Sequence, residues 1–148
     1  MDASQNEAQR NPAIHELFDG ITYRLIDQDS LASHEVTISA VVCDSRVCFQ
    51  GSCFVAIPGT VVDGHDYLKK AVEGGASILV VQKGSREQAF YDDFAVPILE
   101  VEDARSVYAK LAANWFENPA EQLEIIGITG TNGKTTITYL LEEILVGM

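Results

Sequence analysis

The chain has 148 residues, 47% of them hydrophobic, and a formal net charge of −12. This length and apolar fraction suffice for a globular domain with a buried core. The acidic balance disfavours nucleic acid and anionic membranes as partners, because both attract clustered Lys and Arg side chains. Residues 1–13 lack the apolar segment of a signal peptide and no apolar run is long enough to span a bilayer, so we expect a cytoplasmic protein.

The first half of the chain predicts two strands after a short amphipathic piece at residues 13–21. Segment 36–42 alternates between apolar and other residues, which is typical of a strand. The residues expected on one face of it are Val36, Ile38, Ala40 and Val42. Residues 53–59 form an apolar run that stops at Pro58 and Gly59, which predicts a buried strand ending in a turn.

A helix is predicted within residues 63–75, with Asp63 as its cap and Gly74-Gly75 as its stop. Its apolar stripe comprises Leu68, Ala71 and Val72. Two continuous apolar runs follow, 77–81 and 96–101, as expected for central parallel strands that are covered on both faces. The polar segment 82–95 between them has room for a short helix.

The clearest helical pattern begins at Ala104, directly after the acidic pair Glu102-Asp103, which suits the positive end of a helix dipole. Its apolar stripe comprises Ala104, Val107, Tyr108, Leu111, Ala112 and Trp115. Asn118-Pro119 breaks the pattern and marks a domain boundary. Strands that alternate with helices predict an α/β fold, with a small mixed or parallel sheet and flanking helices.

After this boundary, the order of elements is a strand at 124–129, a glycine-containing loop and a helix. The apolar residues with helical period are Ile137, Leu140, Leu141, Ile144 and Leu145. The loop matches a phosphate-binding P-loop only as a variant, because the first glycine of the strict pattern would fall on Ile128. Asn132-Gly133 also suits a type I′ hairpin, but the helical period downstream favours the phosphate loop.

The chemistry of the loop follows from its residue types. Glycines allow backbone N–H groups to converge on a phosphate, and a helix N-terminus adds partial positive charge. Lys134 is suited to neutralise the terminal phosphates, and the Thr135 hydroxyl is a candidate ligand for Mg²⁺.

The cysteines and one histidine are weaker candidates. Cys43, Cys48 and Cys53 are five residues apart, which is neither a zinc pattern nor a closed disulfide framework, so we expect reduced, buried or half-buried thiols. His65 has no second cluster of ligands in the sequence, so a turn or capping role is expected rather than metal binding.

Three segments in one order resemble the Mur ligase family, whose members assemble the peptide of peptidoglycan. The first is "CDSRVCFQGSCFVAIPGTVVDGHDYLKKAVEGGA", which resembles the UDP-binding domain of the family. The second is "WFENPAEQLEIIGITGTNGKTT", which resembles the junction into the central ATPase domain, and the third is the loop "GITGTNGKTT" at its end, which resembles the ATP-binding loop. The resemblance implies a UDP-substrate-binding domain at 1–121 and the truncated start of a P-loop ATP-binding domain at 122–148.

The resemblance also implies roles for particular residues. Ser45 and the backbone at Cys43 are expected to contact the UDP part of the substrate, together with the turn Thr60-Val61-Val62. The ATP-binding residues are expected to be Gly130, Thr131, Asn132, Gly133, Lys134, Thr135 and Thr136, with Lys134 catalytic and Thr135 on Mg²⁺. Read without the resemblance, Asp44 and Arg46 are more simply a surface ion pair.

The implied reaction is ATP-dependent amide bond formation through an acyl phosphate. The Thr-Asn-Gly form of the loop is most similar to members that add the third residue, meso-diaminopimelate or L-lysine, to UDP-N-acetylmuramoyl-L-alanyl-D-glutamate. Alternatives are a D-alanyl-D-alanine-adding Mur ligase, a non-catalytic UDP-sugar-binding module and an unrelated P-loop protein. Because one strand and one helix cannot close an ATPase core, we expect the chain alone to show no amino-acid-dependent ADP release.

Overall fold

The computed structural model describes residues 12–26 and 36–147. The chain divides into two compact units, Met1–Glu117 and Asn118–Met148. The first unit holds a sheet with helices on both faces, and the second holds the loop and its helix. Each unit is described by itself.

The described part of the first unit contains a five-stranded sheet in the order β1-β5-β4-β3-β2. The strands are β1 Arg24–Leu25, β2 Ala40–Val42, β3 Ser52–Val55, β4 Ala76–Gln82 and β5 Ile98–Val101. Strands β2 to β5 run parallel to one another, whereas β1 pairs antiparallel with β5. This confirms the expected α/β class with a small mixed sheet.

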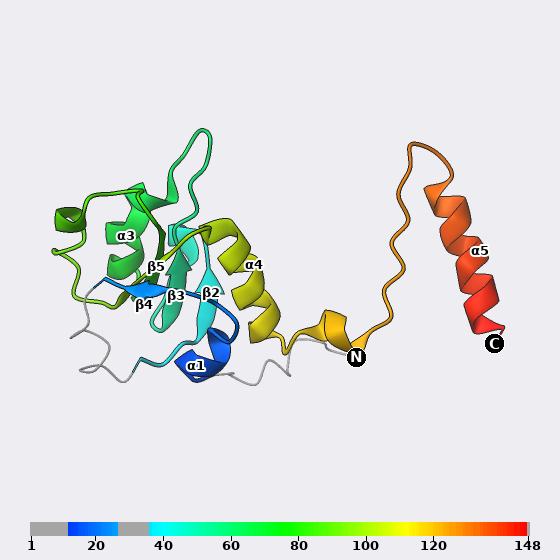
Figure 1. Ribbon diagram of the computed structural model, residues 1–148, viewed down its shortest axis with the longest axis horizontal. Coiled ribbons are helices and arrows are strands. Elements are labelled where there is room, and N and C mark those ends of the chain that lie inside the picture. Colours follow the sequence, from blue (N-terminus) through cyan, green and yellow to red (C-terminus); the bar gives the residue numbers. More distant parts are fainter. Residues whose placement is uncertain (1–11, 27–35, 148) are drawn as a thin grey trace. The chain divides into compact units, whose positions relative to one another are not determined.

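Helices cover the two faces of this sheet (Figure 1). The helices of the first unit are α1 Ile14–Leu17, α3 Leu68–Glu73 and α4 Ala104–Trp115, with short 3-10 turns η1 Ser45–Val47, η2 Gly64–Tyr67 and η3 Gln88–Phe90. The core on one face joins α1 and α4 to the sheet, and the core on the other face joins α3 and the end of η3 to it.

Strand β4 shows why the sheet has two covered faces. Ile78 and Val80 pack into the core with α4, whereas Leu79 and Val81 pack into the core with α3. All four side chains are fully buried, as expected when successive side chains of a central strand point to opposite covered faces. The prediction for residues 77–81 is therefore confirmed, whereas β5 has an antiparallel neighbour, β1, on its other side.

The predicted helix at 104–115 is also confirmed, and its start is capped. The Asp103 carboxylate accepts hydrogen bonds from the backbone N–H groups of Arg105 (2.9 Å) and Ser106 (3.2 Å). Asp63 is a cap as well, accepting from His65 N–H, but the turn that it caps is the 3-10 turn η2, and α3 begins only at Leu68. The short helix expected within 82–95 is the 3-10 turn η3.

The prediction for residues 36–42 was wrong in its register. Only Ala40–Val42 forms a strand, and Ile38 and Val42 pack on opposite faces of the sheet. Ile38 and Val41 share the core with α4 although they are three residues apart. The alternation of side chains between the two faces is therefore interrupted between Ile38 and the start of β2. For this reason the face of each β2 residue could not be predicted from residues 36–38.

The second unit contains the 3-10 turn η4 Pro119–Gln122 and helix α5 Lys134–Val146. Helix α5 confirms the helical period, but the strand predicted at 124–129 forms no ladder. Ile125 and Ile126 are 68% and 59% exposed, because no neighbouring strand in this unit pairs with them. None of the helices in the described part of the chain is long and apolar enough to cross a membrane.

Candidate nucleotide-binding site

A cavity of about 430 Å³ lies outside the carboxyl ends of β2 and β3. Ligands of open α/β sheets commonly bind at this edge, where backbone groups of several loops converge. We call this cavity the β2–β3 pocket. Its lining residues are Cys43, Asp44, Ser45, Arg46, Phe54, Ile57, Val62, Gly64, Tyr67 and Lys70.

The segment after β2 supplies one wall of the pocket. The chain leaves the strand at Val42 and turns into η1, which Asp44 caps by accepting a hydrogen bond from Arg46 N–H at 2.9 Å. This turn places Cys43 and Ser45 in the pocket wall, and Ser45 as a whole is only 8% exposed. Two of the residues expected to contact UDP are thus neighbours in one cavity.

Asp44 and Arg46 form the ion pair that the sequence alone suggested. Arg46 Nε lies 3.0 Å from both carboxylate oxygens of Asp44, and Arg46 Nη2 lies 2.6 Å from Oδ2. The hydrogen bonds from Arg46, with a smaller contribution from nearby Lys70, lower the pKa of Asp44 to about 2. Both residues of the pair also line the pocket.

Lys70 brings a different kind of charge to the pocket. It projects from α3 and lines the cavity, and no ion pair within the described residues involves it. Its ammonium group is therefore the cation best placed to meet an anionic ligand there. Tyr67, one helical turn earlier, lines the same wall. Sequence reasoning missed both residues, although their i, i+3 spacing puts them on one face.

The residues of the turn Thr60-Val61-Val62 differ in their position relative to the pocket. Val62 lines the pocket, whereas Thr60 and Val61 do not. Val61 is 93% exposed, so its side chain contacts little of the protein. The structure therefore brings together Cys43, Ser45 and Val62, and leaves Thr60 and Val61 outside the lining.

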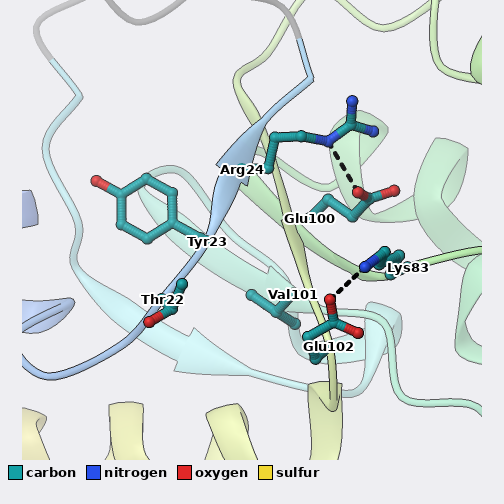
Figure 2. Close-up of a pocket in the computed structure, with 7 residues that line it drawn as sticks. All are labelled: Thr22, Tyr23, Arg24, Lys83, Glu100, Val101 and Glu102. Atoms are coloured by element: carbon teal, nitrogen blue, oxygen red, sulfur yellow. Dashed lines mark hydrogen bonds and ion pairs between the residues drawn. The ribbon is translucent and has the colours of Figure 1, made fainter.

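A second cavity, of about 530 Å³, lies where β1 pairs with β5 (Figure 2). Its two cations are both paired with carboxylates. Arg24 Nε lies 2.9 Å from Glu100 Oε2, and Lys83 donates to Glu102. Paired cations are less available to an anionic ligand, so this cavity is a weaker candidate for a nucleotide than the β2–β3 pocket.

The predicted phosphate loop lies in the second unit. Gly130 and Gly133 have φ values of +149° and +79°, in the region that favours glycine. Helix α5 begins at Lys134, directly after Gly133, which excludes the alternative hairpin at Asn132-Gly133. Lys134 Nζ donates to the carbonyl oxygens of Gly130 (2.6 Å) and Thr131 (3.4 Å), so the side chain folds back over the loop.

The loop has donors that suit a phosphate. Helix α5 has no side-chain cap, so the N–H groups of its first turn are not satisfied by side chains. Thr135 adds one hydroxyl oxygen of the kind that Mg²⁺ accepts. Across residues 12–26 and 36–147, no three His, Cys, Asp or Glu side chains are grouped to hold a metal ion.

The three cysteines are free thiols and differ in exposure. Cys53 is buried, which raises the pKa of its thiol to about 12, and burial also raises the pKa of Cys48. Cys43 is exposed, contrary to the expectation of buried or half-buried thiols, because it follows the edge strand β2 and faces the pocket. None of these surroundings indicates a metal site.

Comparison with known proteins identifies the family. The family model described as "Mur ligase family, catalytic domain" matches residues 37–116, which is more than half of the chain. The chain therefore belongs to the Mur ligase family.

Curated relatives include two named UDP-N-acetylmuramoyl-L-alanyl-D-glutamate--2,6-diaminopimelate ligase. The protein from Oceanobacillus iheyensis is 44% identical over 107 residues, covering 72% of this chain and 21% of the relative. The protein from Clostridium botulinum is 38% identical over 120 residues, which covers 81% of this chain and 24% of the relative. The chain thus spans about a quarter of the length of these relatives.

Solved structures show the same fold. MurF from Acinetobacter baumannii aligns with a TM-score of 0.63 at 25% identity, covering 95% of this chain and 28% of that one. A second structure from this organism, titled as the D-alanyl-D-alanyl ligase, aligns with a TM-score of 0.63 at 23% identity and covers 29% of its chain.

Proposed function

We propose that residues 1–121 bind the UDP part of UDP-N-acetylmuramoyl-L-alanyl-D-glutamate in the β2–β3 pocket. The observation that carries this proposal is the meeting of separated segments in one cavity. Cys43 and Ser45 come from the end of β2, Val62 from the turn after β3, and Lys70 from α3. Lys70 has no ion-pair partner among the described residues, and a free ammonium group suits a diphosphate.

For the whole protein we propose an ATP-dependent ligase that adds a diamino acid to this substrate. The names of the curated relatives support 2,6-diaminopimelate as that amino acid. Residues 122–148 would begin the ATP-binding domain, in which the loop from Gly130 to Thr136 holds the phosphates. The D-alanyl-D-alanine-adding activity is the second candidate, favoured only by the structural neighbours at 23–25% identity.

In the proposed reaction the substrate carboxylate attacks the terminal phosphorus of ATP, which forms an acyl phosphate and releases ADP. The incoming amino group then attacks the acyl carbon, and an amide forms as inorganic phosphate and a proton leave. Mg²⁺, when bound, would neutralise phosphate charge. In this chain we assign that neutralisation to Lys134, whose ammonium group would first leave the carbonyl oxygens of Gly130 and Thr131. The hydroxyl of Thr135 would hold the cation.

The test of the pocket is calorimetry of UDP-N-acetylmuramoyl-L-alanyl-D-glutamate binding to the 148-residue chain. We expect Lys70→Ala to weaken binding about tenfold, the effect of losing one charge-assisted hydrogen bond. Lys69→Ala is the matched control, because Lys69 is the adjacent, equally charged residue of α3 and lines a different groove. Equal losses in both variants, or no binding by the folded wild-type chain, would contradict the proposal.

A further inference from the structure

His65 is a fully buried polar residue that the proposed site does not use directly. Its side chain is 0% exposed and both ring nitrogens have partners. Nδ1 lies 2.6 Å from Asp63 Oδ1, and Nε2 lies 3.1 Å from the backbone nitrogen of Gln82. A peptide N–H can only donate, so Nε2 is the acceptor and the proton sits on Nδ1, which donates to Asp63.

Beyond the end of β3, the His65 imidazole takes the place of a backbone acceptor for the next N–H group of β4. Ala56 N–H donates to Val80 O at 2.8 Å, and the chain then leaves the sheet through Ile57 and Pro58. Two residues further along β4, Gln82 N–H donates to His65 instead of to a strand. The part-buried Gln82 N–H is thereby satisfied by a side chain of the turn that follows β3.

Gln82 extends this connection to the opposite face of the sheet. Its side-chain oxygen accepts a hydrogen bond from Ala104 N–H at 3.2 Å, at the start of α4. Asp63 extends it in the other direction, because its second oxygen accepts from Arg86 Nη1 at 3.0 Å. His65 therefore joins η2 to the end of β4 and, through Gln82, to α4.

The turn that His65 anchors forms one wall of the β2–β3 pocket. Ile57, Val62 and Gly64 from this turn all line the cavity. Gly64 N–H donates to Ile57 O at 3.1 Å, and a Cβ at Gly64 would lie only 2.7 Å from Ile57 N. The two ends of the turn are thus packed backbone against backbone, directly beside His65.

We propose that His65 is a positioning residue for the nucleotide pocket. By accepting the Gln82 N–H and donating to Asp63, it holds the turn 57–64 in the geometry that lines the cavity. This inference rests on the proposed binding of UDP in that pocket. His65 does not line the β2–β3 pocket, but in this proposal it affects UDP affinity as well as the stability of the chain.

Three variants separate affinity from stability, with UDP as the calorimetric probe. His65→Phe keeps the ring without nitrogen atoms, and His65→Asn keeps only a donor near Nδ1, so both lose the acceptor for Gln82. We expect each to weaken UDP binding about tenfold. His65→Gln places an amide oxygen near Nε2, and we expect it to restore most of the affinity.

Leu111→Ala is the control for general destabilisation, because Leu111 is buried in the core on the α4 face and lines none of the cavities described above. It should lower the denaturant midpoint and leave the UDP affinity of the folded chain unchanged. If His65→Phe lowers the denaturant midpoint but still binds UDP with wild-type affinity, the inference is overturned. If the folded wild-type chain binds no UDP, the proposed function fails and the inference falls with it.

Hydrogen exchange of the wild-type chain provides a second test, which does not require the His65 variants to fold. If UDP binds the anchored turn, it should slow hydrogen exchange of the Gln82 amide, since ligand binding and opening of the turn are linked. The Lys83 amide, which donates to Val101 O within the sheet, is the internal control and should change less. Bound UDP with unchanged exchange at Gln82 would overturn the inference.

Discussion

At the scale of single residues, the charges around the β2–β3 pocket fall into two kinds. The guanidinium group of Arg46 forms an ion pair with Asp44, whereas Lys70 has no ion-pair partner among the described residues. A cation that is already neutralised contributes less to an anionic ligand than a free one does. We therefore propose that Lys70 supplies the charge that attracts the ligand, whereas Asp44 and Arg46 hold the turn η1.

The first prediction concerns the pKa of Asp44. Because Arg46 holds the folded-state pKa at about 2, below the ordinary 3.8, the contribution of this pair to stability is present above about pH 4 and is lost as the pH falls toward 2. NMR titration of the carboxyl carbon should give a midpoint near 2. Arg46→Gln should move it toward 3.8, and Lys70→Ala should move it less, because Lys70 contributes least. A midpoint near 3.8 in the wild-type chain would contradict the pairing.

At the scale of elements, the local sequence of α4 and its packing against the sheet favour the same helix. Its apolar stripe faces the sheet, with Ala104 and Leu111 buried, and its first turn is capped by Asp103. The Ser106 hydroxyl donates to Asp103 Oδ2 at 2.7 Å, in addition to the two backbone donors. The start of this helix carries Ala104 N–H, which bonds to Gln82, so the cap also fixes the end of β4.

Removing this cap should therefore be measurable. We expect Asp103→Ala to lower the free energy of unfolding by about 0.5–2 kcal/mol, the usual effect of losing a capping side chain, with an unchanged denaturant m-value. Asp103→Asn, which keeps an acceptor, should lose less. Glu102→Ala is the neighbouring control, since Glu102 is an exposed partner of Lys83 in a pair worth about 0–1 kcal/mol. Urea unfolding that shows no difference between Asp103→Ala and Glu102→Ala would contradict the role of the cap.

The elements also show what the sequence could predict. The helix at 104–115 was predictable from an unbroken helical period, and the buried strand at 77–81 from a continuous apolar run. Strand β1 is only two residues long, too short for any period, and its antiparallel pairing depends on the distant β5. In the pocket, Cys43 and Ser45 follow from the motif, whereas Lys70 depends on how α3 is rotated against the sheet, which only packing decides.

At the scale of the whole molecule, the two units differ in how much apolar surface they bury. The first unit has two cores, whereas no described residue of the second unit is buried. Ile137, Leu140, Ile144 and Leu145 of α5 are 46–59% exposed. The apolar stripe of α5 is thus not covered within the described residues of its own unit.

The most direct test of the central claim is an NMR titration of the isotope-labelled chain with UDP, recording backbone amide shifts. We expect the shifts to concentrate in segments 43–46 and 57–70, which contain most of the residues lining the β2–β3 pocket, and to be absent from the loop 130–136 at low UDP concentration. Shifts that centre on Arg24 and Lys83 in the second cavity, or on the loop alone, would contradict the assignment of the UDP site.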